Sequence, residues 1–312
     1  MKKIILTAYG SVNGFQETTV AMPTLLPEEI LIKLVATSVD DSDVGMRQHG
    51  PFPTMPAEFR PTLPHMLGHD FSGIVTQVGN RVTKFAVGDH VVGFSQPGTY
   101  TEYLAVNQDQ GVVKVPHDLD LVPLGGLILS GVTAWSAVIK NGQVQAGQRV
   151  LIHGGAGGVG SVAIQLAKAA GATVITTASA QHYQYLKNLG ADTIIDYRTQ
   201  DFTKLVHDVD LVVNLTGPQT LAQSYQVVKR GGRLTSVNGV PNPVRAKLHG
   251  IYATYAMGDP SLTALNELMR LYRDGQLTVN VSQTYPFTLT GIQQAHLDFE
   301  QGSNQGKRII TF

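Results

Sequence analysis

The strongest constraint on the fold is a glycine-rich loop between a buried strand and an amphipathic helix. The apolar run Arg149–His153 leads directly into Gly154–Gly160, and apolar residues at a spacing of three and four then continue to Gly171. That spacing predicts a helix, which Gly171 ends. Another helix is predicted at Leu221–Val228. Further short apolar runs occur at 173–177, 193–195, 211–214 and 233–237. Such alternation is typical of a parallel, doubly wound α/β sheet.

The loop itself carries the pattern G-x-G-x-x-G at Gly155, Gly157 and Gly160. In dinucleotide-binding units the first glycine permits a tight turn and the second lets the backbone approach a pyrophosphate. The third allows the helix to pack closely on the strand. The helix N-terminus adds free amide protons and a partial positive charge. We therefore predict dinucleotide binding, with a ligand-free turn as the alternative. The amides expected to contact the pyrophosphate are those of Ala156, Gly157, Gly158 and Val159.

The end of the second strand of this unit indicates which dinucleotide is bound. NAD-binding units usually place Asp or Glu there to hold the ribose 2′-hydroxyl. In this chain the strand ends at Ala178-Ser179, and the first acidic residue after Gly155 is Asp192. A carboxylate that would repel a 2′-phosphate is therefore missing, which favours NADPH. No Arg or Lys is expected close to the strand end, so the predicted selectivity is modest. The side chains expected to hydrogen-bond the 2′-phosphate are Ser179, His182 and Tyr197.

Two later strands also end in residues suited to line the cofactor. Ligands of open α/β sheets bind outside the carboxyl ends of the strands. The residues at the end of the fourth strand are expected to flank the adenosine-side ribose; they are Asn214, Leu215 and Thr216. The residues at the end of the next strand are expected to face the nicotinamide amide; they are Val237, Asn238 and Gly239. Each has an alternative role as an ordinary turn or cap residue.

The rest of the chain predicts a second, β-rich domain built from both termini. Residues 1–118 contain short β-branched and aromatic runs bounded by Gly, Pro, Asp or Asn. The C-terminal part, with a helix at 261–273 and strands at 280–287 and 308–312, is too small to form a core alone. Its strands are expected to join the sheet of the N-terminal part. We predict one domain from 1–118 and 255–312, with 119–254 inserted as the cofactor domain.

Composition narrows the functional classes. The chain has no cysteine, which excludes disulfides, thiolate nucleophiles and zinc sites that need sulfur. Its 23 basic residues balance 23 acidic ones without a Lys/Arg cluster, so neither nucleic acid nor a membrane surface is an expected partner. The initial apolar run stops at Leu6, and no stretch approaches the roughly 20 apolar residues of a membrane span. We expect a cytoplasmic protein.

Several motifs resemble those of the medium-chain dehydrogenase/reductase superfamily, and most of all its zinc-free quinone oxidoreductase (zeta-crystallin) branch. They are Ser38-Val39-Asp40-Asp41-Ser42-Asp43, Leu67-Gly68-His69-Asp70, Val87-Gly88-Asp89, Gly131-Val132-Thr133-Ala134-Trp135, Leu189-Gly190-Ala191-Asp192, Gly231-Gly232-Arg233-Leu234 and Gly306-Lys307. The resemblance covers nearly the whole chain. It implies a GroES-like β-rich catalytic domain beside a Rossmann domain. It also implies that Thr133 lies on the nicotinamide side and that Lys307 lies near the cofactor.

The chain departs from its branch at residues that bear on catalysis. Asp40 replaces an Asn that in the branch often lies near the nicotinamide and substrate, and Asp41 replaces a Pro. Zinc-dependent relatives use a Cys near Asp43 and the His of a G-H-E motif, which is His69 here. Catalytic zinc normally needs three protein ligands. We therefore expect no metal, and we assign Asp43 and His69 to structural hydrogen bonds.

Without metal or thiol, the implied reaction is hydride transfer from NADPH to a small, electron-poor carbonyl compound such as a quinone or an enone. An acceptor of this type needs no zinc or strong acid to polarise its oxygen. Candidate substrate-site residues are Asp40, Asp43 and Tyr100, with Tyr252 and Tyr255 as further candidates for its wall. The alternatives are a low-turnover NADPH-binding sensor or structural protein and a zinc-type alcohol dehydrogenase. A homodimer is expected.

Overall fold

In the computed structural model, which describes residues 1–52, 60–302 and 305–312, the chain forms two compact units. Unit 1 consists of Met1–Leu129, Pro260–Met269 and Val279–Phe312. Unit 2 consists of Ser130–Asp259 and Arg270–Thr278. The chain enters unit 2 at residue 130, later than the predicted 119, because the short helix α2 (Leu121–Leu124) packs on strands of unit 1.

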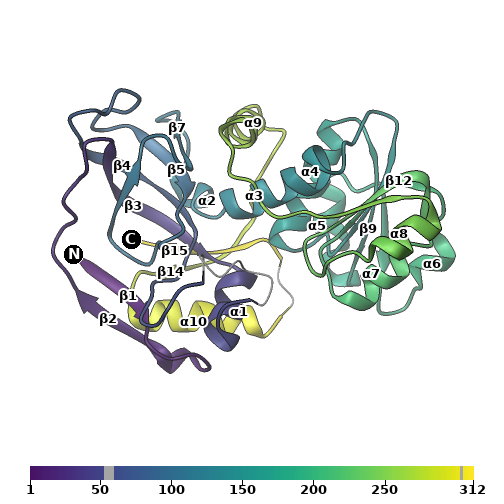
Figure 1. Cartoon of the computed structure of the whole chain (residues 1–312), viewed down its shortest axis with the longest axis horizontal. Coiled ribbons are helices and arrows are strands. Elements are labelled where there is room, and N and C mark those ends of the chain that lie inside the picture. The colour runs from purple at the N-terminus through teal and green to yellow at the C-terminus, as the bar shows by residue number, and fades with distance from the viewer. Residues whose placement is uncertain (53–59, 303–304) are drawn as a thin grey trace. The chain divides into compact units, whose positions relative to one another are not determined.

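The described part of unit 1 is built on a seven-stranded sheet (Figure 1). Six strands follow the order β14-β15-β3-β4-β5-β7, and β6 pairs with β3. The strands are β3 (Glu29–Val39), β4 (Asp70–Val78), β5 (His90–Phe94), β6 (Tyr103–Asn107), β7 (Val112–Val115), β14 (Val281–Pro286) and β15 (Lys307–Thr311). A separate antiparallel pair joins β1 (Lys2–Leu6) to β2 (Phe15–Thr19).

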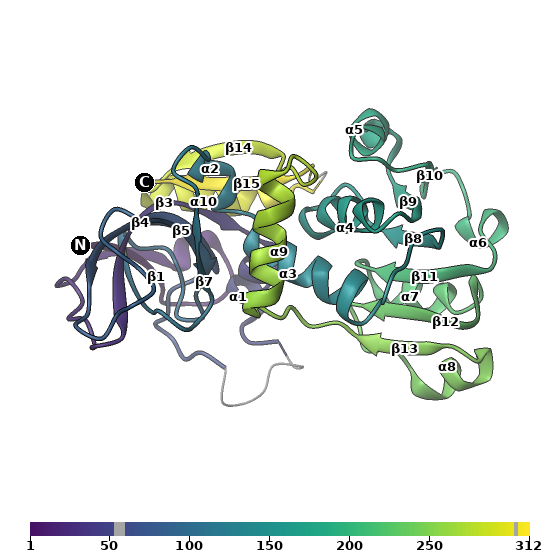
Figure 2. The same ribbon diagram turned by 90° about the horizontal axis from the view of Figure 1, so that it is seen from above.

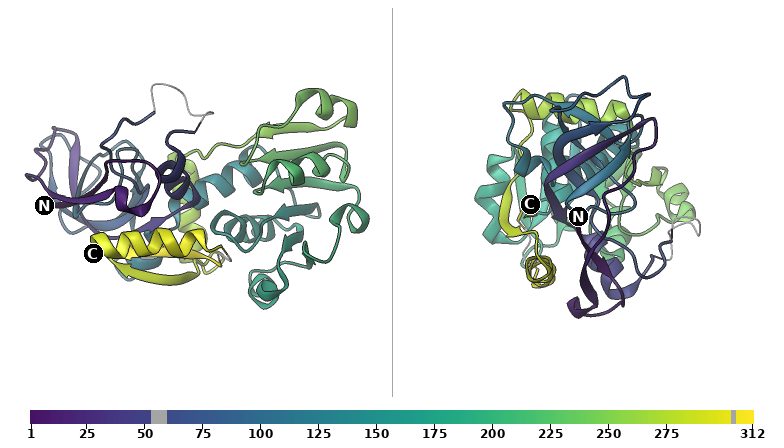
Figure 3. Two further views of the ribbon diagram at one scale, coloured as in Figure 1. Left: turned by 90° about the horizontal axis from the view of Figure 1, so that it is seen from below. Right: turned by 90° about the vertical axis from the view of Figure 1, so that its left-hand side faces the viewer.

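Both ends of the chain contribute to unit 1. β15 pairs antiparallel with β3, so the prediction that the C-terminal strands join the N-terminal sheet is confirmed. Three further elements of unit 1 are the short helix η1 (Val12–Gly14), α1 (Asp41–His49) and α10 (Leu289–Glu300). Figure 3 shows the yellow α10 beside purple N-terminal segments, and α10 contacts η1, β2 and α1. Residues distant in sequence therefore meet in this unit.

The core of unit 1 follows from alternation along its central strand. Ile30, Ile32 and Leu34 recur every second residue of β3 and are buried with Phe71 and Val91 of the neighbouring strands. Successive side chains of a strand point to opposite faces, so one face of β3 supplies this cluster.

Unit 2 contains six parallel strands in the order β10-β9-β8-β11-β12-β13 (Figure 2). This is the strand order of a doubly wound dinucleotide-binding sheet, so the predicted fold class is confirmed. The strands are β8 (Arg149–His153), β9 (Thr173–Ala178), β10 (Thr193–Asp196), β11 (Val209–Asn214), β12 (Val228–Ser236) and β13 (Tyr252–Tyr255). The direction of the strand order reverses between β8 and β11, and ligands of such sheets bind at this point.

The helices of unit 2 connect these strands. They are α4 (Gly158–Ala169), η4 (Ala180–His182), α5 (Tyr183–Asn188), α6 (Phe202–Leu205), α7 (Pro218–Ser224) and α8 (Pro243–His249). Helix α3 (Ile128–Trp135) precedes a π-helical turn, Ser136–Lys140, and α9 (Leu262–Arg273) follows β13. The predicted helix at Leu221–Val228 is wrong in its second half. Pro218 starts α7 earlier, and Val228 already belongs to β12.

Within the described ranges, no helix has both the length and the apolar character needed to cross a membrane.

Candidate functional site

The glycine loop after β8 uses its glycines for different reasons. Gly154 has φ +78°, so the left-handed turn lies there and not at Gly155, where the sequence predicted it. A Cβ on Gly155 would lie 2.1 Å from Thr176 Oγ1, so Gly155 is required by packing against β9. A Cβ on Gly160 would lie 2.2 Å from Gly154 O. This agrees with the predicted close packing of helix on strand.

Gly157 differs from its neighbours because the space beside it is open. It is the N-cap residue of α4, with an ordinary φ of −73°. Among the described residues beyond its chain neighbours, the atom nearest to a Cβ built there would be Gly154 O, at 3.6 Å. The first amides of a helix lack intrahelical partners, and Gly157 has no side chain to cap them. The N-terminus of α4 is therefore chemically suited to an anion, and a larger side chain at Gly157 would project into the same space.

The ends of β9 and β10 lie next to each other. Ala178 is in register with Asp196, and the amide of Tyr197 donates to Ala178 O at 3.3 Å. The structure thus brings Tyr197 near Ser179, the residue that follows β9. The Tyr197 ring is 60% exposed, whereas the Ser179 and His182 side chains are largely buried.

A cation near this edge was missed by the sequence analysis. The guanidinium carbon of Arg198 lies 5.9 Å from the centre of the Tyr197 ring. Arg198 lies two residues beyond β10, and the amide of its neighbour Tyr197 bonds to the end of β9, so Arg198 is a candidate cation for this edge. Asp196 is also nearby, but its carboxylate accepts from Arg198 N and Thr199 Oγ1 within its own turn.

Asn214 organises the loops after β11 and β12. It is fully buried, and its Nδ2 donates to Thr216 O at 3.0 Å, to Ser236 Oγ at 3.1 Å and to Asn238 O at 3.3 Å. The structure therefore brings 214–216 and 237–239 together at one edge of the sheet. The amide of Asn214 holds these loops in place, which differs from the ribose contact expected for it. Leu215 and Thr216 are partly exposed, and Asn238 and Gly239 are exposed.

His153, the last residue of β8, fixes the strand end that precedes the glycine loop through its side-chain contacts. It is fully buried, with Nδ1 3.0 Å from Thr177 Oγ1 and Nε2 3.2 Å from Ser224 Oγ. Burial lowers the pKa of His153 to about 3, so it is neutral at physiological pH. The imidazole links β8 to β9 and α7. No motif in the sequence indicated this role.

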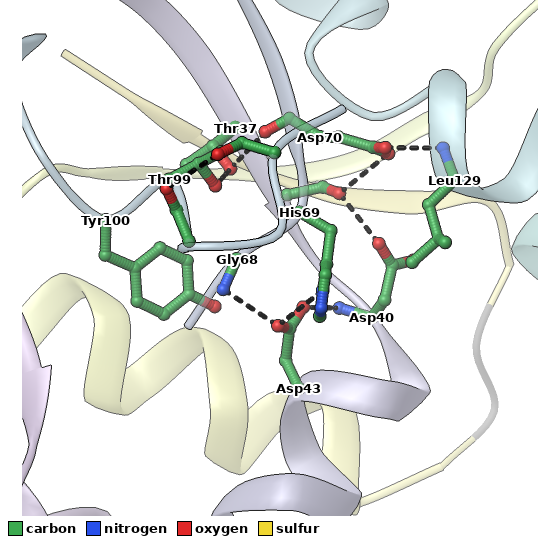
Figure 4. A network of polar contacts seen from close by, with 12 residues as sticks. Thr37, Asp40, Asp43, Gly68, His69, Asp70, Thr99, Tyr100 and Leu129 are labelled. Carbon is green, nitrogen blue, oxygen red and sulfur yellow. Dashed lines mark hydrogen bonds and ion pairs between the residues drawn. The ribbon is translucent and has the colours of Figure 1, made fainter. Parts of the chain in front are cut away.

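Asp43 anchors a polar network in unit 1 (Figure 4). It is fully buried in the first turn of α1. Its Oδ1 accepts from Gly68 N at 2.9 Å and lies 3.2 Å from His69 Nδ1, and its Oδ2 accepts from Asp40 N at 2.9 Å. Although burial opposes ionisation, His69 and the hydrogen bonds hold the pKa of Asp43 below its usual value. Both oxygens of the Asp43 carboxylate are thus hydrogen-bonded or ion-paired to groups of the protein. Its predicted contact with substrate is not supported.

Lys307 lies among carboxylates. Its ammonium ion-pairs with Asp40 and is 3.8 Å from Asp70 Oδ2, and its side chain is buried. Burial alone would lower the pKa of Lys307, but the neighbouring Asp40 and Asp70 raise it. The Lys307 charge is therefore compensated inside unit 1, and its expected placement near the cofactor stays a prediction.

Asp70 is the second fully buried carboxyl group of the network, beside Asp43. It is fully buried and accepts a hydrogen bond from the amide of Leu129 in the first turn of α3. Burial raises the pKa of Asp70 to about 7, although Lys307 opposes the shift.

Tyr100 packs inside unit 1. Its side chain is fully buried, and its hydroxyl is 3.0 Å from Nε2 of the equally buried His296. It therefore presents no surface to a substrate, contrary to the prediction. Of the three candidates Asp40, Asp43 and Tyr100, only Asp40 retains an exposed edge, with 13% of its side chain accessible.

The remaining predicted residues occupy unit 2. Thr133 is partly buried on α3, and a Cβ on Gly258 would lie 2.9 Å from its hydroxyl. Tyr252 and Tyr255 lie on the edge strand β13, where Tyr252 is exposed with the Arg233 guanidinium over its ring. Within residues 1–52, 60–302 and 305–312, no group of three or more His, Cys, Asp or Glu side chains is arranged to hold a metal ion.

Comparison with known proteins places this geometry in a family. Residues 26–117 match the model of the alcohol dehydrogenase GroES-like domain, and residues 189–310 match that of the zinc-binding dehydrogenase. A 2-methylene-furan-3-one reductase from Solanum lycopersicum is 32% identical over 99% of this chain and 79% of its own length. An NADPH-dependent alkenal/one oxidoreductase from Arabidopsis thaliana is 30% identical with the same coverage.

A solved structure agrees over the full length. The Escherichia coli quinone oxidoreductase, in a crystal structure complexed with NADPH, matches with a TM-score of 0.88 and 26% identity, covering 100% of both chains. The predicted GroES-like and Rossmann folds are thereby confirmed. On these matches the chain belongs to the medium-chain dehydrogenase/reductase superfamily, with quinone and alkenal oxidoreductases among its relatives, as its motifs predicted.

Proposed function

We propose that this protein is an NADPH-dependent, zinc-independent oxidoreductase that transfers hydride to quinones or other α,β-unsaturated carbonyl compounds. The observation that carries the proposal is the open N-terminus of α4 beside Gly157. This helix end lies where the strand order reverses between β8 and β11, which is the point at which open α/β sheets bind ligands. The relatives named above support the same class of reaction.

The residues around this loop fit a dinucleotide. The amides of Ala156 to Val159 would hold the pyrophosphate, because Gly157 leaves the space beside the helix end open. Residues 214–216 and 237–239 would line the ribose and nicotinamide portions, with Asn214 fixing the two loops. Once bound, the nicotinamide supplies the hydride. The chain contributes binding, orientation and exclusion of water.

The end of β9 favours NADPH over NADH. Ser179 and Tyr197 would donate hydrogen bonds to the 2′-phosphate, and Arg198 would add the positive charge that the sequence analysis missed. The buried His182 would contribute by supporting Ser179, whose carbonyl accepts the His182 amide at 3.1 Å. Arg binds phosphate through charge-assisted hydrogen bonds, which are about twice as strong as neutral ones. Selectivity for NADPH should accordingly be stronger than the sequence alone indicated.

Electron-poor acceptors fit the groups that this chain offers. The names of the relatives include a furan-3-one reductase, an alkenal/one oxidoreductase and a quinone oxidoreductase. Such acceptors take hydride without a metal to polarise their oxygen. Asp43 and His69 could together offer only two of the three protein ligands that catalytic zinc normally needs. The Asp43 carboxylate is already paired with Gly68, His69 and Asp40, which supports zinc independence.

One experiment tests the proposal against its alternatives. NADPH consumption by the purified protein would be followed with a panel of quinones, enones and aldehydes, beside metal analysis of the same sample. Steady turnover with quinones or enones and without bound zinc is the expected result. Tight NADPH binding without turnover would favour a sensor or structural protein. Stoichiometric zinc, lost together with activity, would favour an alcohol dehydrogenase of the zinc type.

A further inference from the structure

Ser38 lies between two carboxyl groups in unit 1. Its Oγ atom is 3.0 Å from Asp40 Oδ2 and 3.3 Å from Asp70 Oδ2. A hydroxyl carries one proton, so it donates to only one of these oxygens at a time. If both carboxyls were ionised, the other contact would set the Ser38 oxygen against a carboxylate oxygen in a buried place. Both contacts are hydrogen bonds only when one of the carboxyls carries a proton.

The surrounding charges favour that proton. Three carboxyl groups, Asp40, Asp43 and Asp70, meet two basic groups, Lys307 from β15 and His69 beside β4. With every group charged the network carries a net charge of −1, and one proton on a carboxyl makes it neutral. Burying an uncompensated charge is unfavourable. Asp41, on α1, adds a further acidic group beside Asp40.

The two carboxyls differ in access to solvent. Asp70 is fully buried, whereas Asp40 keeps an exposed edge. Figure 4 shows Asp70 reaching the amide of Leu129 at one end of the network and Asp40 above the start of α1 at the other. Burial also raises the pKa of Asp70 to about 7, which places the proton on Asp70 near neutral pH.

We propose that Asp70, Ser38 and Asp40 form a proton relay, in which Asp70 stores one proton and Asp40 releases it at its exposed edge to the acceptor. The relay rests on the proposed function, because reduction of a carbonyl acceptor consumes one proton for each hydride.

The step balances when the stored proton reaches Asp40 before it leaves. Asp70 gives its proton to the Ser38 oxygen, and Ser38 gives its own hydroxyl proton to the Asp40 carboxylate, so Asp70 becomes ionised and Asp40 becomes protonated. Hydride brings two electrons to the acceptor, which is reduced and becomes an oxyanion or enolate. The Asp40 carboxyl then gives its proton to that anion, so one O–H bond breaks and one O–H or C–H bond forms. A proton from water later returns through Asp40 and Ser38 to Asp70 and restores the starting state.

The stored proton is testable without substrate or cofactor. Infrared difference spectra of the full-length protein would be recorded as the pH is raised through neutrality. A band of a protonated carboxyl is expected to disappear across this range, and Asp70→Asn is expected to remove it. Asp109→Asn, at an exposed carboxyl paired with Lys84, is the control that should leave the band unchanged. Absence of the band near pH 6, or its survival in Asp70→Asn, would overturn the proposal.

The transfer step is tested by kinetics with an enone. Ser38→Ala should lower kcat on the order of 100-fold, the usual contribution of a positioned proton donor, and should change the solvent isotope effect. Ser38→Thr keeps a hydroxyl and should restore both. Ser72→Ala is the matched control, because Ser72 is also buried in the sheet and its hydroxyl donates to Leu121 O and not to a carboxylate.

The outcomes separate the two proposals. If Ser38→Ala affects kcat and the isotope effect no more than Ser72→Ala does, the relay is refuted, although turnover with NADPH still supports the proposed function. If the unmodified protein reduces no acceptor, the proposed function fails and the relay has no reaction to serve. The infrared titration still decides whether the stored proton exists.

Discussion

A substitution at Gly157 should change cofactor binding while leaving the protein folded, so it tests the binding site directly. Because the nearest described atom to a Cβ at Gly157, Gly154 O, would be 3.6 Å away and φ is −73°, alanine fits without strain. Alanine restricts the unfolded chain, which is worth about 0.4–1 kcal/mol, but it caps a helix less well than glycine, so its net effect on stability should be small. Valine adds two further methyl groups and is a poor N-cap residue, and the weaker capping costs about 1 kcal/mol of stability. We therefore expect Gly157→Val to remain soluble and cooperatively folded.

Binding should respond very differently. The valine side chain projects into the space where the pyrophosphate would approach α4, so a loss in NADPH affinity of at least about 100-fold is expected, near 2.7 kcal/mol. NADPH at about 100 times its Kd should stabilise the unmodified protein by roughly 2.7 kcal/mol. In a domain of this size that is a rise in Tm of about 5–10 °C. The same NADPH concentration should leave the Tm of Gly157→Val almost unchanged.

Gly155→Ala is the matched comparison within the same loop. Its Cβ would lie 2.1 Å from Thr176 Oγ1, so the variant should lose about 1–3 kcal/mol of stability by overpacking. Differential scanning calorimetry and titration calorimetry measure the two effects separately. If Gly157→Val keeps near-normal NADPH affinity, the loop does not hold the pyrophosphate and the central argument for the proposed function fails.

Four further predictions concern selectivity, metal, pH and assembly. Arg198→Ala and Ser179→Asp should each weaken NADPH at least about 10-fold relative to NADH, measured as Kd values; equal losses for both cofactors would contradict the 2′-phosphate assignment. Chelator treatment should leave activity intact. His153 and His296 are buried with a pKa of about 3 each, below about 6.5 in the unfolded chain. The unfolded state therefore takes up protons first, and each histidine should cost up to about 1.4 kcal/mol per pH unit as pH falls from 6.5 toward 3. Urea unfolding at several pH values, with His153→Gln for comparison, measures this loss. Light scattering should find a homodimer, which an exposed Tyr252 on the edge strand β13 supports; a monomer at micromolar concentration would contradict it.

Local patterns were sufficient to predict five strands of the unit 2 sheet and the helix α4, but not the edge strand β13. Arg149–His153 was predicted residue for residue, because a buried parallel strand and an amphipathic helix each leave a periodic signal within a few residues. The end of α7 was predicted wrongly, since Val227 and Val228 suit a helix face and a strand equally well. The turn residue of the loop also escaped prediction. Gly154 and Gly155 are adjacent glycines, and only the backbone angles distinguish the turn from the packing contact.

The polar network of unit 1 could not be predicted in the same way. Asp40 and Lys307 are 267 residues apart, and Tyr100 and His296 are 196 apart. Their contacts depend on the pairing of β15 with β3 and on the packing of α10, both of which are set by tertiary structure. Arg198 was missed for a related reason. Its nearness to β9 follows from the register of Asp196 with Ala178, which no single strand reveals.

The polar network of unit 1 explains what the replacement of Asn by Asp at position 40 changes physically. Relatives of the quinone oxidoreductase branch are expected to carry Asn there, a neutral side chain that both donates and accepts hydrogen bonds. Asp40 only accepts when ionised, so it cannot take over a donor role of that Asn. Its charge is compensated by Lys307, and its second oxygen accepts from Ser38. When Asp40 is ionised and Asp70 is protonated, Ser38 donates to Asp40 and Asp70 donates to Ser38. Asn at position 40 would remove the group that can receive a proton from Ser38. Asn→Asp at this position therefore does not simply repeat the chemistry of the relatives. It replaces an amide that donates and accepts with a carboxylate that pairs with Lys307 and accepts from Ser38, as the proposed relay requires.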